Sequence, residues 1–486
     1  MAGTTKTLIG IDIGTTSVKA VLLAASGQRL AAFSRPYPTA RPAPGLVEQD
    51  AADWLALVIA ALESFQAHPG CGQVQAIGFT SQVNTHVFTD AAFAPLRPAI
   101  VWQDGRAAAA GAAIDAQIGL AEKTALLGAP IPVDASHALA RISWLARHDP
   151  VALRGSAHVF APKDFCIARL TGRVAADPVS SVGLVGTDLA YAGALIALVP
   201  GAARLLPPLL DPLCVVGPIL PGLPLAGTPV VLGTMDAWAS LFGVGVAEPG
   251  QAMYLSGTSE VLGLISPTRV PVPGVITFPQ WAGITLHAGP TQAGGASLDW
   301  LGRVLGRGVA EMAAIAAPVA AISPVFLPHL QGERAPLWDM QAKGAFAGLT
   351  GATGPAELVT AVMEGVAFSA RLALEALEQA GAVRAPVIQA GGGGMAPDIW
   401  CQIRADVLGR PLLRMQALDA GAVGAAVMAG VGAGLMPGLV QAAQHLVRQD
   451  RIFQPDPAAA KRADQRFQLY GQLYHQLRGV NAALAG

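Results

Sequence analysis

The sequence has few of the residues that mark secreted, zinc-binding or nucleic-acid-binding proteins. Only four of its 486 residues are cysteines, and these are scattered at Cys71, Cys166, Cys214 and Cys401. Such spacing predicts neither a disulfide framework nor a zinc site, and it favours a reducing cytoplasm. Charged residues make up 13% of the chain and the formal net charge is −1. We therefore expect neither nucleic acid nor a membrane surface as a partner.

The chain also lacks an uninterrupted apolar run that would make a membrane-spanning helix. Residues 212–235 carry almost no charge but contain five prolines, which prevent one continuous helix. Residues 420–447 contain six glycines and Pro437, and we read them as a buried helix, a loop and a second helix. No signal-peptide layout precedes the apolar stretch that starts at Leu8. A cytoplasmic protein without membrane segments is the expectation.

What the chain has in abundance is apolar residues, which make up 52% of it. This content and this length predict two large domains with well-buried cores. Strand and helix patterns alternate, which indicates an α/β fold. The stretches "DIGTTSVKAV" and "YLSGTSEVLG" share a strand, a Gly-Thr turn and a second strand. We interpret them as an internal duplication and place the boundary near residue 248, giving domains 1–248 and 249–486.

The opening stretch "LIGIDIGTTSVKAVLL" predicts a hairpin with a polar tip. Gly14 permits an unusual backbone conformation, and residues 15–17 offer hydroxyls and free N–H groups that can cradle a phosphate. The carboxylate of Asp12 lies beside this turn and has the oxygen ligands that a hard cation prefers. The alternative from these residues alone is an ordinary hairpin in which Asp12 forms the turn.

Polar residues follow two further strand patterns, "QAIGFTSQ" and "PAIVWQDGR". Ligands in open α/β sheets gather at the carboxyl ends of the strands. We therefore expect the polar residues that follow these two strands to lie at one site: Gln82, Asn84, Trp102, Asp104 and Arg106. Between the hairpin and these strands, Asp50 is expected to cap a helix that runs to about Gln66.

Two segments of the second half have strong local patterns. Residues 388–394 read as a strand followed by four glycines and then a helix, and such a loop can approach a nucleotide closely. The alternative is a flexible loop, since a lone glycine run is weakly specific. Residues 457–478 predict a C-terminal helix whose many Gln and Arg residues indicate a solvated face.

Taken together, these motifs resemble the FGGY carbohydrate kinases, and within them most closely the xylulokinases. The resemblance covers nearly the whole chain, from Leu8 to about Gly434, with the motifs in the order of the family. They are "IGIDIGTTSVKAVLL", "AIGFTSQVNTH", "RPAIVWQDGRA", "APKDFCIARLTG", "GTMDAWAS", "YLSGTSE", "GGASLDWLG", "FLPHLQGERAPLWD", "AKGAFAGLTGATG" and "AGGGGMAPDIWCQIRADVLGRPL".

The resemblance implies a two-lobed, actin-like ATPase fold with duplicated ribonuclease-H-like domains and a cleft between them. It implies ATP and Mg²⁺ as cofactors, with Asp12 near the metal and Asp236 of "GTMDAWAS" as the catalytic base. From local pattern alone, Asp236 also reads as a helix N-cap. The resemblance assigns nucleotide binding to Thr15, Thr16, Ser17, Lys19, Gly257, Thr258, Gly295, Asp299, Gly392, Gly393 and Gly394. Dimers are common among similar kinases, so a homodimer is possible.

Substrate choice is the part of the resemblance that the sequence leaves open. Residues Gln82, Val83, Asn84, Trp102, Asp104 and Asp236 are the candidates for sugar binding. Xylulokinases typically have Met-His where this chain has Val83-Asn84, and Asp-Asn where it has Asp236-Ala237. D-xylulose is the leading substrate, with ribulose, erythrulose or a sugar alcohol as alternatives. His86 is either a substitute for the missing histidine or a half-exposed strand residue.

A rival of another class is an actin-like or chaperone-like ATPase that binds nucleotide without a sugar. The polar strand ends at Gln82, Asn84 and Asp104, together with Asp236, argue against it because such a module needs no hydroxyl pocket. Dependence of ATP turnover on added sugar separates the two hypotheses.

Overall fold

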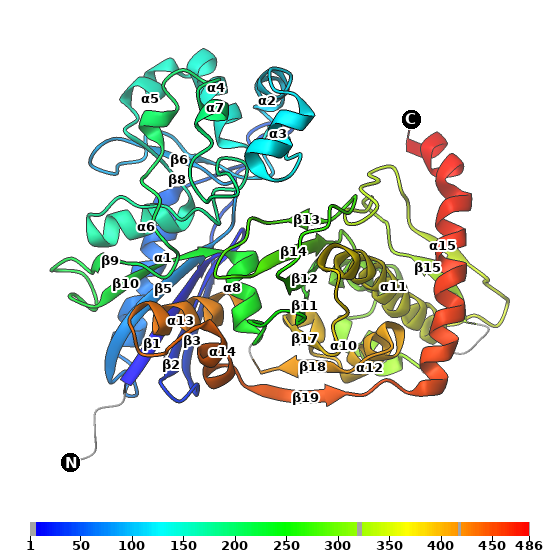
Figure 1. Cartoon of the computed structure of the whole chain (residues 1–486). Helices are drawn as coiled ribbons and strands as arrows, with labels where there is room; N and C mark the ends of the chain where they lie inside the picture. The colour runs from blue at the N-terminus through cyan, green and yellow to red at the C-terminus, as the bar shows by residue number, and fades with distance from the viewer. Residues whose placement is uncertain (1–5, 318–322, 417–418, 486) are drawn as a thin grey trace. The chain divides into compact units, whose positions relative to one another are not determined.

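The computed structural model describes residues 6–317, 323–416 and 419–485. They form two compact units, the first built from residues 6–245 and 419–447 and the second from residues 246–317, 323–416 and 448–485. Each unit is organised around one large β-sheet with helices packed on it (Figure 1).

The sheet of the first unit has six strands in the order β3-β2-β1-β5-β10-β9. In chain order these strands are β1 (Lys6–Ile13), β2 (Ser17–Ala24), β3 (Arg29–Pro36), β5 (Gln73–Ser81), β9 (Val215–Pro218) and β10 (Pro229–Met235). The first three pair antiparallel, whereas β1, β5 and β10 run parallel. The carboxyl ends of these three strands therefore meet at one edge of the sheet.

The sheet of the second unit repeats this plan. Its order is β13-β14-β12-β11-β17-β18-β19. The strands are β11 (Ala252–Ser256), β12 (Glu260–Ser266), β13 (Ile276–Thr277), β14 (Thr285–Pro290), β17 (Ile388–Gly391), β18 (Leu412–Met415) and β19 (Gln449–Phe453). Four antiparallel strands, β13, β14, β12 and β11, take the place of the antiparallel trio, and two parallel strands and an antiparallel edge strand again follow. The duplication predicted from the two hairpin motifs is confirmed in this topology.

Most helices of the first unit lie between strands β5 and β9, in an insertion that also contains short strands. The helices are α1 (Ala51–Gln66), α2 (Ala108–Asp115), α3 (Leu120–Leu127), α4 (Ala138–His148), α5 (Pro150–Gly155), α6 (Pro162–Thr171), α7 (Gly193–Ile196), α8 (Asp236–Gly243), α13 (Ala420–Gly432) and α14 (Leu439–Leu446), with a 3-10 turn η1 (Ala203–Leu205). The side chain of Asp50 accepts the N–H of Ala52 and caps α1, as predicted.

One predicted strand is mostly loop in the structure. Of "PAIVWQDGR", only β7 (Ala99–Ile100) is extended, and it pairs with β4 (Glu48–Gln49) outside the six-stranded sheet. A second small pair joins β6 (Val87–Thr89) to β8 (His158–Phe160). Trp102 and Asp104 therefore follow a two-residue strand of a separate ribbon, and not a strand of the six-stranded sheet.

The placement of α13 differs from the domain division predicted at residue 248. This helix packs on β1, β5 and α8 of the first unit. Glycines make the close approach possible: a Cβ on Gly78 would lie 2.0 Å from the carbonyl oxygen of Ala425, and one on Gly424 would lie 1.6 Å from that of Ala239. Backbone-to-backbone packing of small residues thus assigns residues 419–447 to the first unit.

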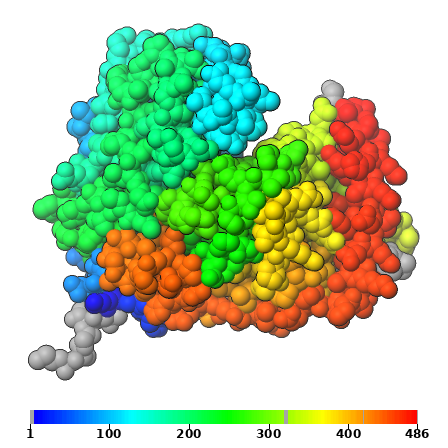
Figure 2. All heavy atoms as spheres, viewed as in Figure 1, coloured from blue at the N-terminus to red at the C-terminus, as the bar shows by residue number. Residues whose placement is uncertain are grey.

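The helices of the second unit pack partly on its sheet and partly on one another, and the C-terminal helix lies at the surface of the unit (red in Figure 2). They are α9 (Gly295–Leu305), α10 (Val309–Ile315), α11 (Pro355–Gly381), α12 (Asp398–Leu408) and α15 (Pro457–Ala485), with a 3-10 turn η2 (Gly393–Met395) and a small sheet of β15 (Val325–Leu327) and β16 (Ala345–Ala347). The predicted solvated α15 is partly a core helix, because Arg466, Tyr470 and Tyr474 on one of its faces are buried. Within the described ranges, no helix is both long and apolar enough to cross a bilayer.

Candidate active site

Two carboxylates lie at the edge of the first sheet where the parallel strands end. Asp12 is the last but one residue of β1, and Asp236 follows β10 directly as the first residue of α8. Strands β1 and β10 flank β5 on either side. Met235 occupies the N-cap position of α8, so Asp236 is not the helix cap, although its Oδ1 accepts the N–H of Ala237 at 2.8 Å.

Burial makes both carboxyl groups hold their protons unusually tightly. The pKa of Asp12 is raised to about 7, first by desolvation and then by the negative charge of Asp236. Desolvation raises the pKa of Asp236 to about 6. The positive charge of Lys19 opposes the shift at Asp12, and Lys19 itself lies 3.2 Å from the carboxylate of Asp419 at the start of α13. The four residues form one electrostatic cluster.

The surroundings of Asp12 fit a metal ion that is held mainly by water and phosphate. Its Oδ1 is buried and has no hydrogen-bond partner within the described residues. Its Oδ2 lies against the start of α13, since a Cβ on Gly421 would be 2.5 Å from it. No group of three or more metal-binding side chains occurs in the described part of the chain. Mg²⁺ usually keeps several waters and takes one or two carboxylates, which suits this arrangement.

The tip of the opening hairpin is tied to the predicted sugar-binding residues. The indole N–H of Trp102 donates to Thr15 Oγ1 at 3.1 Å, and Gln49 Nε2 donates to the Thr15 carbonyl at 2.8 Å. Gln82 Nε2 in turn donates to Gln49 Oε1 at 3.0 Å. Thr16 is exposed at the tip, and Gly14 N donates to the Ser17 carbonyl at 3.1 Å to close the turn. The turn and the end of β5 thus form one hydrogen-bonded unit.

Asp104 makes only internal contacts. Its carboxylate accepts Arg106 Nε at 2.8 Å, Arg106 Nη2 at 2.7 Å and the Val47 N–H at 2.6 Å, and the residue is 1% exposed. These contacts lower its pKa, although burial alone would raise it. The structure therefore places Asp104 under the loop that carries Trp102, where it fixes the loop. Trp102 itself is 39% exposed.

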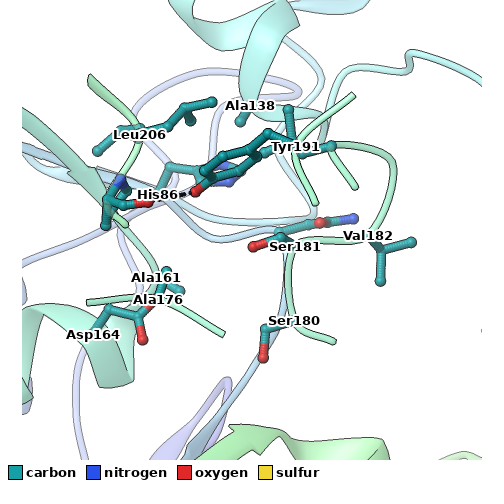
Figure 3. Close-up of a pocket in the computed structure, with 14 residues that line it drawn as sticks. His86, Ala138, Ala161, Asp164, Ala176, Ser180, Ser181, Val182, Tyr191 and Leu206 are labelled. Carbon is teal, nitrogen blue, oxygen red and sulfur yellow. Dashed lines mark hydrogen bonds between the residues drawn. The ribbon is translucent and has the colours of Figure 1, made fainter. Parts of the chain in front are cut away.

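Asn84 borders a small cavity inside the first unit (Figure 3). It has a positive φ of 55° and donates to Ser136 Oγ at 3.2 Å, while Val83 beside it is half-buried and apolar. The cavity holds about 40 Å³, enough for a few water molecules. His86, Asp164, Ser180 and Tyr191 line it further.

His86 is held in its neutral form at this cavity wall. Its Nδ1 accepts Arg141 Nη1 at 2.7 Å, and burial together with the Arg141 charge lowers the pKa of His86 well below its ordinary value. Arg141 also donates to the carbonyls of Asn84, Ile100 and Val101. His86 is half-exposed and forms a β-bridge to Ile100, and it lines the same cavity as Asn84, so its role at the sugar stays a prediction.

In the second unit, the predicted nucleotide residues gather around the β11–β12 hairpin. Gly257 and Thr258 form its exposed tip, and their carbonyls accept the N–H groups of Gly295 at 2.8 Å and Ala296 at 3.0 Å. Gly392 has a φ of 90°, and a Cβ there would lie 2.4 Å from the Ser256 carbonyl oxygen. The chain thus brings the Gly392–Gly394 loop, the hairpin tip and the start of α9 together.

Asp299 lies apart from this group of turns. It is exposed one helical turn along α9 and lines a separate surface hollow with Arg303, Arg307 and the glycines 306 and 308.

Sequence reasoning missed three residues of these sites, namely Gln49, Asp419 and Arg404. Gln49 belongs to the two-residue strand β4, which is too short to leave a pattern in the sequence, and only the fold brings it to Thr15 and Gln82. Asp419 stands directly before a helix of small residues, and Asp236 is the first residue of α8. This similar position of the two aspartates was a signal that could have identified Asp419 as a site residue. Arg404 lies inside an apolar helix pattern and is fully buried beneath the glycine loop, where it donates to Gly394 O.

Comparison with known proteins gives the family. Residues 7–243 match the N-terminal domain of the FGGY family of carbohydrate kinases, and residues 252–433 match its C-terminal domain. The chain therefore belongs to the FGGY family of carbohydrate kinases, a class of sugar kinases, and the predicted family resemblance is confirmed.

Among known relatives, a xylulose kinase of Escherichia coli (strain K12) is 31% identical over 491 residues, covering 96% of this chain and 99% of the relative. A glycerol kinase of Aromatoleum aromaticum (strain DSM 19018 / LMG 30748 / EbN1) is 32% identical over 481 residues, covering 94% of this chain and 95% of the relative. The crystal structure of xylulose kinase from Rhodospirillum rubrum matches with a TM-score of 0.87 and 29% identity, over 98% of this chain and 100% of that chain. The predicted actin-like ATPase fold is confirmed by this match.

Proposed function

We propose that this sugar kinase transfers the γ-phosphoryl group of ATP to a primary hydroxyl of a ketopentose or related polyol, with D-xylulose as the leading substrate. The observation that carries the proposal is the half-buried carboxylate of Asp236 at the carboxyl end of β10, beside Asp12 at the end of β1. Phosphoryl transfer needs a carboxylate to accept the proton of the attacking hydroxyl and needs little covalent chemistry beyond that.

Asp236 acts as the general base in this proposal. The sugar hydroxyl attacks the γ-phosphorus, the bond to the β-γ bridging oxygen breaks, and the hydroxyl proton passes to Asp236. With a pKa of about 6, the carboxyl is mostly ionised at neutral pH yet more basic than an ordinary aspartate. A base poised near the working pH is the more effective proton acceptor. The N–H of Ala237 holds one oxygen, which leaves the other for the substrate.

Asp12 and the polar turns supply positioning and charge compensation. Mg²⁺, when bound, neutralises the negative charge of the phosphates, and Asp12 is the residue that would hold it through its unpaired oxygen. The tip residues Thr15–Ser17 offer hydroxyl and N–H donors to phosphate. Lys19, paired with Asp419, adds a positive charge next to them. In the second unit, the glycine turns allow close backbone approach to the nucleotide.

The sugar is selected by the residues around Asn84 and Trp102. The exposed ring of Trp102 offers an apolar face for the C–H side of a sugar. Asn84 is an amide, which donates to and accepts from hydroxyls. Val83 and Ala237 leave fewer polar contacts than the Met-His and Asn of typical xylulokinases, so a ketose other than xylulose is the second candidate.

The test is a coupled ADP-release assay against D-xylulose, ribulose, erythrulose, glycerol and sugar alcohols. We expect one ketopentose to give turnover that Asp236→Asn lowers by at least about a thousandfold. Asp188→Asn, which changes an exposed turn aspartate, is the matched control and should keep full activity. Sugar-independent ATP hydrolysis, unchanged by any sugar and by Asp236→Asn, would contradict the proposal and favour the ATPase-module hypothesis.

A further inference from the structure

A fully buried ion pair lies beneath the turns that gather around the β11–β12 hairpin. Arg404 of α12 and Glu260 of β12 are both 0% exposed, and Arg404 Nη2 lies 2.7 Å from Glu260 Oε1. Burying two charges is expensive, and such a pair is weak evidence for stability alone. We therefore explain the buried pair by the two chain segments that it holds in position, namely the glycine loop and strand β11.

The guanidinium of Arg404 joins the glycine loop to two residues of strand β11. Nη1 donates to the carbonyl of Gly394 in the glycine loop at 2.9 Å. Nη2 donates to Ser256 Oγ at 2.8 Å, and Ser256 is the last residue of β11, directly before Gly257. Nε donates to the hydroxyl of Tyr254 at 3.2 Å. One planar side chain thus sets the distance between the loop and the hairpin tip.

Glu260 closes the network from the opposite strand. It accepts the Tyr254 hydroxyl at 2.6 Å and the Ser256 hydroxyl at 2.8 Å in addition to Arg404. The ring of Trp400 covers the guanidinium at 4.1 Å. The loop and the strand also touch directly, since a Cβ on Gly394 would lie 2.2 Å from Ser256 Oγ. The N–H donors of Arg404 are therefore held in one orientation by Glu260, Trp400 and the residues that accept their hydrogen bonds.

We propose that Arg404, held by Glu260, is a positioning residue for nucleotide binding: it fixes the Gly392–Gly394 loop against the Gly257–Thr258 turn at the spacing that ATP requires. The inference rests on the proposed function only in taking these turns as the nucleotide site. A lysine cannot replace the arginine here. Its single ammonium cannot reach Gly394 O on one side and Glu260 on the other at once.

The experiment compares two conservative substitutions in the second unit. Arg404→Lys should raise the KM for ATP and the dissociation constant of ADP about tenfold and leave the KM for the sugar within about twofold. Arg466→Lys is the matched control. Arg466 is also buried and paired with Glu364 (Nε to Oε1, 2.8 Å), but its other contacts are to the carbonyls of Ser323 and Pro324, away from the glycine turns. It should lower thermal stability to a similar degree without changing the KM for ATP.

A milder variant keeps the test decisive if Arg404→Lys does not fold. Tyr254→Phe removes the hydroxyl shared by Arg404 and Glu260, and it should weaken ADP binding about threefold. Equal effects of Arg404→Lys and Arg466→Lys on ADP binding, or no effect of Tyr254→Phe, would overturn the inference. Because ADP titration needs no sugar, the outcome stays distinguishable from a failure of the proposed sugar kinase reaction.

Discussion

Asp12 is expected to reduce the stability of the fold in the absence of metal. Its pKa of about 7 in the folded chain exceeds the ordinary aspartate value of 3.8 by about three units. Below pH 4 both the folded and the unfolded states hold the proton. Between pH 4 and pH 7 only the unfolded state releases it, so the stability that the neutral carboxyl contributes is lost as the pH rises. Three units correspond to about 4 kcal/mol at pH 8.

The substitution Asp12→Asn removes this penalty because an amide does not ionise. An amide in a buried site costs roughly 1–3 kcal/mol where it lacks partners, so the net gain at pH 8 is expected to be about 1–3 kcal/mol. Near pH 4 no gain is expected. The same substitution should abolish sugar-dependent turnover, since the carboxylate assigned to the metal is gone.

The measurement is urea unfolding at pH 4.5 and pH 8 with a chelator present, followed by far-ultraviolet circular dichroism. Asp50→Asn is the matched control, since asparagine caps a helix as well as aspartate does, and it should stay within about 0.5 kcal/mol of the parent at both pH values. If Asp12→Asn is less stable than the parent at pH 8, Asp12 is a structural hydrogen-bond acceptor and the reasoning is refuted.

Three further predictions follow from the same geometry. The kcat/KM for the sugar should rise with pH along a limb with an apparent pKa between about 6 and 7, set by the coupled pair of Asp12 and Asp236, and a flat profile from pH 5 to 8 would contradict it. Gly424→Ala should destabilise the chain by about 3 kcal/mol or more in thermal unfolding, because the new Cβ would lie 1.6 Å from a carbonyl oxygen, whereas Gly193→Ala has open space and should be neutral. Trp102→Phe should raise the KM for the sugar several-fold through the lost indole hydrogen bond, and equal kinetics would exclude a role for that contact.

The local elements of the candidate site could be predicted because their signals are local. The hairpin at Asp12, the strand before Asp236 and the glycine run at 392–394 each combine a period-two apolar pattern with turn residues. The structure has all of them where the sequence predicted them. The family resemblance added their order, and the comparisons confirm it.

The contacts between distant segments could not be predicted in this way. Gln49 reaches Thr15 from the short strand β4, and Arg404 lies under Gly394 although its helix pattern reads as ordinary core. Trp102 and Asp104 follow a two-residue strand of a separate ribbon, since β7 pairs with β4 and not with the main sheet. Periodicity indicates which face of an element is buried but not which partner covers it.

The fold class, the family and the two aspartates at the strand ends could therefore be predicted from the amino-acid sequence, because they depend on short-range patterns and on motif order. The tertiary structure alone decided that residues 419–447 join the first unit, where α13 packs on Gly10 and Gly78 through its own backbone. It also decided the pKa of Asp12, which depends on burial and on the charge of Asp236 far along the chain, and the pKa of Asp236, which depends on burial. The placement of residues 419–447 and the two pKa values both depend on packing between segments that are far apart in the chain, and a local sequence pattern contains no information about that packing.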